Sequence, residues 1–233
     1  MAPNTPNIII RTTDEITQSR GVKVLVHAGT GVGKTRMCAT APDPFIISAE
    51  HGLLSLKKFR IPATEIRSMA DLGNVYLWLM ESSESRFIQT VCIDSWSDIA
   101  EVFLEELRKI VKDPRQAYFE TQLRILEMTR YFRDIPDKNV YITAKSGYEK
   151  DELSGAMKWG PMMPGNKLAQ LLPFLFDEVW ALRTSSAKDP VTGIPYRYVQ
   201  TQEDLQYLAK DRSGSLAFQE PADLTHLFNK MRA

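Results

Sequence analysis

The sequence has no excess charge of either sign, few cysteines and no long apolar run. Its 29 Lys and Arg residues balance 29 Asp and Glu residues, so bulk charge gives no argument for nucleic-acid binding. Cys38 and Cys92 lack metal-ligand spacing and lie in apolar segments, which is typical of reduced core residues in a cytoplasmic protein. The longest apolar runs, 22–26 and 171–176, are shorter than the roughly 18 residues of a membrane span. Because residues 1–20 also lack a signal-peptide pattern, we expect a cytoplasmic protein without membrane contact.

The remaining composition is that of an ordinary globular chain. Its 233 residues, 43% of them hydrophobic, predict one domain at residues 21–233 behind a polar N-terminal arm at residues 1–20. Short apolar runs alternate with helical periodicity, which predicts an α/β fold with a mostly parallel sheet flanked by helices. Turn residues at 184–196 predict a C-terminal β-hairpin extension. The expected strands are 22–27, 45–48, 87–94, 140–143, 178–182 and 196–201, and the expected helices are 99–110, 119–132 and 222–231.

Residues 145–165 differ from the rest of the chain in pattern. They are rich in glycine, proline and lysine and show little periodicity. A segment of this length without regular structure is usually functional or mobile, so we expect a long loop here.

A glycine-rich segment follows the first expected strand directly. Residues 28–35 read Ala-Gly-Thr-Gly-Val-Gly-Lys-Thr and precede a helix-compatible stretch. In this pattern the backbone N–H groups cradle phosphates, Lys34 reaches the β- and γ-phosphates, and the Thr35 hydroxyl takes a Mg²⁺ position. The alternative is an accidental glycine-rich turn, which the flanking strand and helix patterns disfavour. We therefore expect ATP to be bound by Ala28, Gly29, Thr30, Gly31, Val32, Gly33, Lys34, Thr35 and Arg36.

A phosphate loop needs an acid for its metal, normally at the end of an apolar strand. Asp94 ends the run Thr-Val-Cys-Ile-Asp and would accept from Mg²⁺-bound water. Its alternative role is to cap the helix that starts near Ser97. We favour the metal role because the phosphate loop requires such an acid.

Hydrolysis also needs a group that acts on the attacking water. Ser95 follows Asp94 where many ATPases have a Glu, so the acid must come from a neighbouring strand end. Glu50 lies just past the strand 45–48. Glu65 is not a candidate for this acid, because we interpret it as the start of a short apolar stretch and not as the end of a strand. By itself Glu50 would be interpreted as a solvated surface residue, but its position favours the catalytic role.

Together the phosphate loop, Glu50 in Ala-Glu-His and Asp94 in Val-Cys-Ile-Asp-Ser resemble the RecA-type recombinase core. Over residues 20–232 the chain more closely resembles the short phage-encoded RecA-like ATPases of single-strand annealing and recombination, a group of AAA-type nucleotide-binding proteins. The resemblance implies that Glu50 acts on the attacking water and that Asp94 completes the metal site. It also implies a γ-phosphate sensor at the end of the central strand, which would be Thr143 or Lys145, where RecA itself carries Gln.

The resemblance further implies assembly into a ring or filament. Lys210 and Arg212 match the paired basic residues that reach the ATP of a neighbouring subunit. The alternative for Lys-Asp-Arg-Ser-Gly is a surface turn. The three isoleucines at 8–10 could add a strand to a neighbour's sheet, but they are more often packed in their own chain.

Single-stranded DNA is the partner that the resemblance implies, with a single-strand DNA-binding protein as a further one. We expect the contacts at Lys145, Lys150, Lys158 and Trp159, where lysines near aromatics suit backbone neutralisation and base stacking. Acidic residues lie among them, and a lid over ATP explains the same composition. Two other functions remain open. One is a small-molecule phosphotransferase, although such enzymes usually carry an arginine-rich lid and residues 145–165 contain no arginine. The other is an ATP-switched loader of replication proteins.

Overall fold

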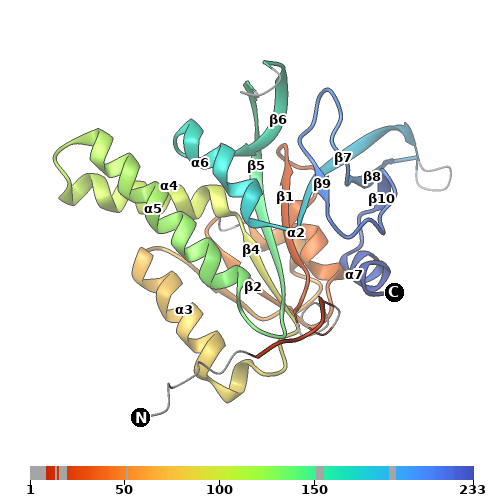
Figure 1. Cartoon of the computed structure of the whole chain (residues 1–233), viewed down its shortest axis with the longest axis horizontal. Coiled ribbons are helices and arrows are strands. Elements are labelled where there is room, and N and C mark those ends of the chain that lie inside the picture. Colours follow the sequence, from red (N-terminus) through yellow and green to blue (C-terminus); the bar gives the residue numbers. More distant parts are fainter. Residues whose placement is uncertain (1–8, 14, 16–19, 51, 151–154, 189–192) are drawn as a thin grey trace, which may run out of the picture.

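The computed structural model describes residues 9–13, 15, 20–50, 52–150, 155–188 and 193–233, and its centre is one large sheet (Figure 1). The strand order is β10-β8-β7-β1-β5-β4-β2-β3, with β6 paired to β5 and β9 paired to β7. The pairings from β3 to β7 along this path are all parallel. The parallel strands are β1 (Lys23–Ala28), β2 (Pro44–Ser48), β3 (Ala63–Glu65), β4 (Thr90–Asp94), β5 (Asn139–Lys150) and β7 (Glu178–Lys188).

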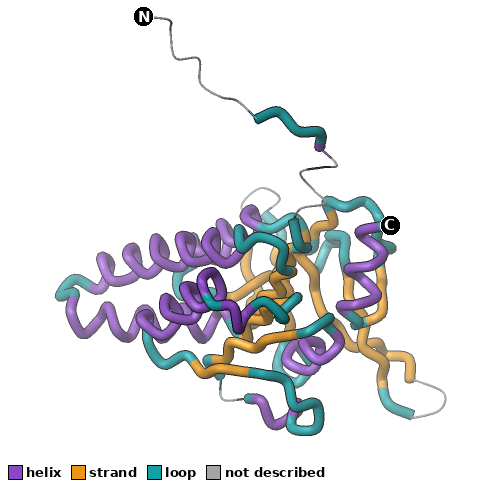
Figure 2. Tube along the Cα trace, turned by 90° about the horizontal axis from the view of Figure 1, so that it is seen from below, coloured by secondary structure: helices purple, strands orange, loops and turns teal. Residues whose placement is uncertain are grey.

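The central strands are buried on both faces, which explains why they form continuous apolar runs in the sequence. Successive side chains alternate between the two faces, so Ile46 and Ile47 belong to different core clusters, as do Tyr141 and Ile142. The helices α3 (Met69–Glu81), α4 (Trp96–Ile110), α5 (Pro114–Arg133) and α6 (Asn166–Leu171) pack on one face. The helices α2 (Lys34–Met37) and α7 (Leu224–Arg232) cover the other (Figures 1 and 2).

Side-chain caps set the starts of the main helices. Ser68, Ser95, Asp113 and Asp223 accept hydrogen bonds from backbone N–H groups in the first turns of α3, α4, α5 and α7. Pro114 occupies the first turn of α5, where its missing N–H costs nothing. Short 3₁₀ turns complete the connections: η1 (Cys38–Thr40), η2 (Leu53–Leu56), η3 (Ser83–Ser85) and η4 (Leu172–Leu175).

Four antiparallel strands extend the sheet: β6 (Met157–Met162), β8 (Pro195–Gln200), β9 (Lys210–Asp211) and β10 (Gln219–Pro221). Strands β7 and β8 form the hairpin that the sequence predicts, although its tip, 189–192, lies outside the described residues. The structure thus confirms an α/β fold with a mostly parallel, helix-flanked sheet and a C-terminal hairpin.

The prediction of a long loop at 145–165 is wrong. Strand β5 continues to Lys150 and pairs with β6, so that Tyr148 lies opposite Trp159. The alternation that would have indicated these strands is hidden by Gly147 and Gly160, which leave gaps in the side-chain pattern. Residues 151–154 lie outside the described part.

Glu65 was also misinterpreted, because it ends strand β3 rather than preceding an apolar stretch. Its side chain pairs with Arg67 at 2.8 Å. Strand β3 was missed because it has only three residues and lies at the edge of the sheet.

The described part of the N-terminal arm includes Ile9 and Ile10, which are 74% and 89% exposed. Figure 2 shows this short segment apart from the body of the domain. Ile8 lies outside the described residues, and the boundary at residues 20 and 21 stays a prediction. None of the described helices is long and apolar enough to cross a lipid bilayer.

Candidate nucleotide-binding site

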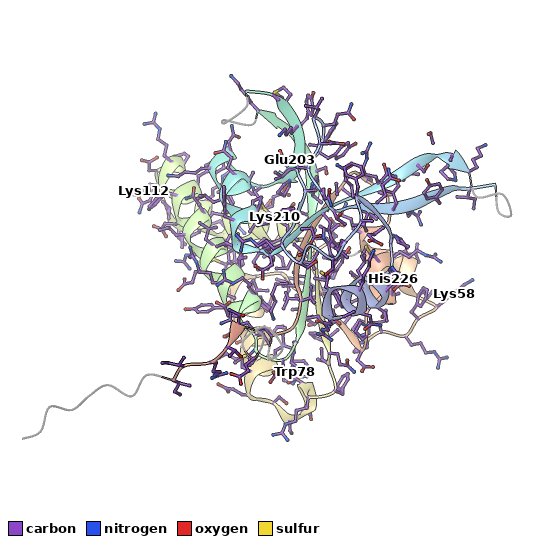
Figure 3. The ribbon with its side chains drawn as sticks, turned by 45° about the vertical axis from the view of Figure 1, so that its right-hand side comes forward. Lys58, Trp78, Lys112, Glu203, Lys210 and His226 are labelled. Atoms are coloured by element: carbon purple, nitrogen blue, oxygen red, sulfur yellow. The ribbon has the colours of Figure 1, made fainter. Side chains whose placement is uncertain are left out.

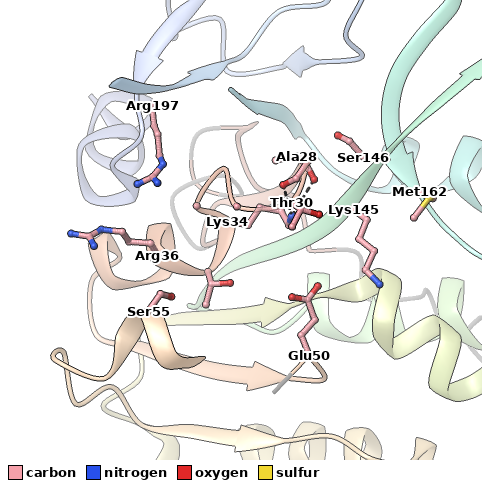
Figure 4. Close-up of a pocket in the computed structure, with 14 residues that line it drawn as sticks. Ala28, Thr30, Lys34, Arg36, Glu50, Ser55, Lys145, Ser146, Met162 and Arg197 are labelled. Carbon is pink, nitrogen blue, oxygen red and sulfur yellow. Dashed lines mark hydrogen bonds between the residues drawn. The ribbon is translucent and has the colours of Figure 1, made fainter. Parts of the chain in front are cut away.

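The phosphate loop lies at the carboxyl edge of the sheet, between β1 and α2. Gly31 and Gly33 adopt φ angles of 74° and 113°, in the region that favours glycine. These conformations curl the backbone around a hollow of about 420 Å³ (Figure 4). The residues that line it are Ala28, Gly29, Thr30, Gly31, Gly33, Lys34, Thr35, Arg36, Glu50, Ser55, Lys145, Ser146, Met162 and Arg197. Of the predicted loop residues, only Val32 is not among them; it packs against the core.

Lys34 lies across the mouth of the loop. Its Nζ donates to the carbonyl oxygens of Ala28 at 3.1 Å and Gly29 at 3.2 Å. Partial burial lowers the pKa of Lys34, while Glu50 and Asp94 oppose this shift by favouring the charged amine. The two acids therefore favour the charged form of Lys34, which is the form that binds phosphate.

Asp94 is buried at the end of β4 and is held by two hydroxyls. Thr35 Oγ1 donates to its Oδ2, and Thr143 Oγ1 donates to its Oδ1, both at 2.5 Å. Ser95, not Asp94, caps α4, so the capping alternative for Asp94 does not hold. Thr143, a residue of β5 and one of the two predicted sensor residues, thus contacts Asp94, the predicted metal-site acid.

The oxygen groups around Asp94 suit a Mg²⁺ ion. Ser48 is paired in register with Asp94, and its Oγ is buried without a hydrogen-bond partner among the described residues. Mg²⁺ prefers oxygen ligands, keeps several waters and is often held by one or two protein groups plus phosphates. Thr35 and Asp94 supply such groups, and Ser48 offers a free lone pair for a metal-bound water. No cluster of three metal-ligating His, Cys, Asp or Glu side chains occurs in the described part of the chain.

Glu50 reaches the same hollow from the loop after β2. The backbone N–H of Ala49 donates to the carbonyl oxygen of Asp94 at 3.1 Å, which ties this loop to the end of β4. Burial, together with the nearby carboxylates of Asp98 and Asp94, raises the pKa of Glu50 to about 7. An acid with this pKa can accept a proton near neutral pH. Its neighbour His51 lies outside the described residues.

Asp98 is a site residue that the sequence did not single out. Its Oδ1 accepts from Lys145 Nζ at 2.5 Å, and Ser95 Oγ donates to its Oδ2. Burial raises the pKa of Asp98, but hydrogen bonds from Glu50, Lys145 and Ser95 outweigh burial and lower it. Asp98 escaped notice because an acid in the first turn of a helix is ordinary. A search for polar residues one turn after a strand-end acid would have found it.

Lys145 points into the hollow from β5 (Figure 4). Burial lowers the pKa of Lys145, but the hydrogen bond to Asp98 and the nearby negative charges of Asp98, Glu101 and Glu50 together outweigh burial and raise it. The sequence assigned Lys145 both to phosphate sensing and to DNA contact. Its position in the nucleotide hollow fits the first assignment and not the second.

A buried histidine connects the hollow to a distant segment. His27 Nε2 lies 2.7 Å from the carbonyl oxygen of Leu208, and its Nδ1 lies 2.7 Å from Ser146 Oγ. Because the carbonyl only accepts, Nε2 carries the proton and Nδ1 accepts from the Ser146 hydroxyl. Burial lowers the pKa of His27 to about 4, so this ring is neutral near pH 7.

The two basic residues predicted to act on a neighbour's ATP lie away from this hollow. Lys210 Nζ donates to the carbonyl oxygens of Pro173 at 2.9 Å and Phe176 at 2.5 Å, at the end of η4 (Figure 3). Arg212 contacts Asp177 at 3.1 Å and is 58% exposed at its side chain. Arg212 therefore remains available to a neighbour, whereas Lys210 is engaged within its own chain. Their role in a neighbouring site stays a prediction.

The residues predicted to bind DNA separate into two groups. Lys158 forms an ion pair with Glu203 (labelled in Figure 3), and Lys145 is held by Asp98. Lys150 is exposed at the end of β5, and Trp159 is 39% exposed on β6. The structure thus leaves Lys150 and Trp159 at the surface and does not bring the four together.

Trp159 belongs to a row of rings that we call the aromatic row: Tyr148, Trp159, Tyr207 and the guanidinium of Arg183. The centroids of Tyr148 and Trp159 are 5.1 Å apart, and Trp159 stacks on Tyr207 at 6.5 Å. Arg183 lies 4.0 Å from the Tyr207 centroid. Sequence reasoning missed the row because the hairpin and a bridge between Trp159 and Tyr207 bring distant segments together.

Arg197 is a lining residue that the sequence did not indicate, as are Ser55, Ser146 and Met162. It extends from β8 over Gly33, so the C-terminal hairpin contributes directly to the phosphate hollow. No local motif marks Arg197, because its position depends on two strand pairings, that of β8 with β7 and that of β7 with β1.

Comparisons with known proteins identify the family. A family model described as an AAA domain matches residues 20–213, most of the chain. No curated protein gives a match. Among solved structures, the KaiC-like protein from the hyperthermophilic archaeon Pyrococcus horikoshii OT3 is 16% identical, with a TM-score of 0.40 over 77% of each chain. At that identity and score, the likeness supports no statement about activity.

The phosphate loop, the buried Asp94 at the end of a parallel strand and the family match agree with one another. The fold is a mostly parallel, helix-flanked sheet with a phosphate loop after β1, as the sequence predicts, and the finer likeness to RecA stays an expectation from the sequence resemblance. The chain belongs to the AAA domain family and is a P-loop NTPase.

Proposed function

We propose that the protein hydrolyses ATP with Mg²⁺ at this hollow. The observation that carries the proposal is the convergence of three residues at the phosphate loop. Lys34 and Glu50 line the hollow (Figure 4), and Asp94 is joined to it through the hydrogen bond from Thr35 Oγ1 at 2.5 Å. A cation for the phosphates, an acid for the metal and a carboxylate with a pKa of about 7 are the groups that hydrolysis requires.

In this proposal each residue has a separate task. Backbone N–H groups of the loop and Lys34 bind and orient the phosphates, and Glu50 accepts the proton of the attacking water. Bound Mg²⁺, held through Thr35 and Asp94, would neutralise charge that develops on the phosphate oxygens. Lys145, released from Asp98, would supply a second cation at the γ-phosphate end.

Two variants test this proposal. Lys34→Ala should abolish binding of a fluorescent ATP analogue. Glu50→Gln should retain binding and lose turnover by on the order of 10²–10⁴-fold, the usual contribution of a general base. Glu101→Gln, an exposed carboxylate on the neighbouring helix, is the control and should keep both properties. Normal turnover by Glu50→Gln would show that the proton acceptor is another group.

We further propose that the aromatic row binds single-stranded nucleic acid. Tyr148 and Trp159 are 53% and 39% exposed, whereas Arg183, at the other end of the row, lies on the Tyr207 ring and pairs with Asp204 at 3.8 Å. Successive bases stack on such side chains with little sequence preference. The row, rather than the engaged lysines Lys145 and Lys158, supports this proposal.

This proposal is tested by replacing exposed aromatic residues with alanine and measuring nucleic-acid binding. Trp159→Ala and Tyr148→Ala should each weaken binding of a labelled thymidine oligonucleotide by on the order of tenfold, since a stacked base contributes about 1–3 kcal/mol. Phe87→Ala removes an aromatic side chain of similar exposure outside the row and should have no effect. Equal binding by all three variants and the parent protein would exclude the row as the site.

Assembly and biological role follow from the sequence resemblance. We propose a homo-oligomer, ring or filament, in which Arg212 approaches a neighbour's nucleotide, in a phage-type annealing or recombination protein that works beside a single-strand DNA-binding protein. Size-exclusion chromatography with and without ATP and single-stranded DNA tests this. A constant monomer would instead favour a phosphotransferase.

A further inference from the structure

A second hollow of about 450 Å³ adjoins the phosphate hollow. The two share Gly33, Arg36 and Arg197, so they are continuous around the phosphate loop. The second hollow is otherwise lined by Met37, Ala39, Thr40, Phe59, Pro195 and Ala222. It thus combines an apolar wall and an aromatic ring with two guanidinium groups at the junction.

Arg197 packs directly on the phosphate loop. A Cβ atom placed on Gly33 would lie 3.1 Å from Arg197 Cδ and Nε and 3.3 Å from its Cζ. The side chain is exposed and comes from β8 of the same chain, not from a neighbour. Arg36, two residues after Lys34, has its guanidinium 6.0 Å from the Phe59 ring centroid.

Within the described part of the chain, the two arginines at this junction have no acidic partner. Among the residues that the structure describes, neither Arg36 nor Arg197 has a carboxylate within ion-pair distance. Two like charges at one hollow repel each other, and a bound anion relieves that repulsion. Planar guanidinium groups match phosphate oxygens in a bidentate manner.

The direction of a nucleotide in the loop follows from the loop's own chemistry. The γ-phosphate end points to Lys34 and the metal-site acid, and the loop N–H groups hold the α- and β-phosphates. Figure 4 shows Glu50 and Lys145 on one side of Lys34, with Arg36 and Arg197 on the other. The α-phosphate and nucleoside therefore lie on the side of the two arginines.

We propose that Arg197, with Arg36, binds the α-phosphate in cis and leads the nucleoside into the second hollow, where the base contacts Phe59. This inference rests on the proposed nucleotide site and names which groups hold the non-reacting end. Because the α-phosphate is retained in ATP and ADP, Arg197 stabilises substrate and product alike. Its loss should therefore raise KM and leave kcat nearly unchanged.

The experiment compares three ligands, ATP, ADP and inorganic tripolyphosphate, by calorimetry with Mg²⁺. Arg197→Ala should weaken all three by about tenfold or more, the loss expected for a hydrogen bond to a charged group. Phe59→Ala should weaken ATP and ADP but not tripolyphosphate, which has no base to contact the ring. Arg197→Lys should recover only part of the affinity, because an ammonium cannot bind two oxygens in a plane. Arg86→Ala, an exposed arginine far from the hollow, is the control and should bind as the parent does.

The outcomes separate this inference from the proposed function. If the parent protein binds none of the ligands, the proposed nucleotide site itself fails. If the parent binds ATP and Arg197→Ala binds it equally well, only the assignment of Arg197 fails. A fall in kcat at unchanged KM would also overturn it, since Arg197 would then act on the reacting phosphate.

Discussion

Lys145 Nζ lies 2.5 Å from Oδ1 of Asp98, so the second cation expected at the γ-phosphate end is held by an acid of α4. The same Asp98 contacts Glu50, the proposed proton acceptor, and contributes to its raised pKa. One acid thus influences both the cation and the base of the proposed reaction. Asp98 thus links the middle of β5 to the segments that follow β2 and β4.

The first prediction concerns the pH profile of hydrolysis. Glu50 accepts a proton only when ionised, so kcat/KM should rise with pH through an apparent pKa near 7. Asp98→Asn removes a negative charge and a carboxylate acceptor beside Glu50, so its pKa should fall and the rising limb should move to lower pH. Rates measured from pH 5 to pH 9 check this. The control Glu101→Gln removes the carboxylate 3.9 Å from Lys145 and should leave the rising limb of the pH profile in place. If the rising limb does not move in Asp98→Asn, Asp98 does not raise the pKa of Glu50.

The second prediction concerns the hydroxyl that holds Asp94. Thr143→Val leaves Oδ1 of a buried carboxylate without its donor, which should cost about 1–3 kcal/mol of unfolding free energy. The same change should raise the free Mg²⁺ concentration needed for half-maximal ATPase rate, because Asp94 is no longer oriented. Thr143→Ser restores the hydroxyl and should restore both properties. Equal Mg²⁺ dependence in Thr143→Val and Thr143→Ser would show that Thr143 does not position the acid.

The third prediction is a pH dependence of stability that His27 produces. Its pKa is about 4 in the folded protein, against 6.5 for the unperturbed group. The unfolded chain therefore binds the proton first as the pH falls, and stability is lost below about pH 6.5. Between pH 7 and pH 5 the loss from this group should be about 2 kcal/mol.

Urea unfolding of the parent protein and of His27→Gln measures this loss. Glutamine can still donate to the Leu208 carbonyl but does not titrate, so the variant should lose about 2 kcal/mol less over the same range. Glu50 and Glu178 have raised pKa values near 7 and act in the opposite direction, but they do so equally in both proteins. Parallel stability curves would contradict a neutral buried His27.

The fourth prediction separates the two basic residues of β9 and its turn. Lys210→Met removes the donor for two carbonyls at the end of η4, so the free energy of unfolding should fall by about 1–3 kcal/mol. Arg212→Ala removes an exposed ion pair and should change stability by less than about 1 kcal/mol. If Arg212 serves a neighbour's nucleotide, Arg212→Ala should still lower the ATPase rate of the oligomer. An unchanged rate at assembling concentrations would argue against that role.

Local chemistry alone determined the core of the nucleotide site. The phosphate loop lies within a few residues of one strand end, and its glycine conformations, its Lys34 and its Thr35 are set by neighbours along the chain. Asp94 and Glu50 were recognisable because carboxyl ends of parallel strands share one edge of a sheet. Each is therefore close to the loop whatever the details of packing.

Only the tertiary structure determined which other side chains belong to the site, because no local pattern relates segments that are far apart in the chain. Asp98 became a site residue through the position of α4 against β5, and Arg197 through the return of β8 beside β7 and β1. Residues 145–165 have the composition of a loop but contain the pairing of β5 with β6. This pairing brings Tyr148 next to Trp159, and the bridge between Trp159 and Tyr207 completes the aromatic row. Packing also engaged Lys210 and Lys158 in contacts within the chain, since a buried or half-buried cation must find partners where the fold places it.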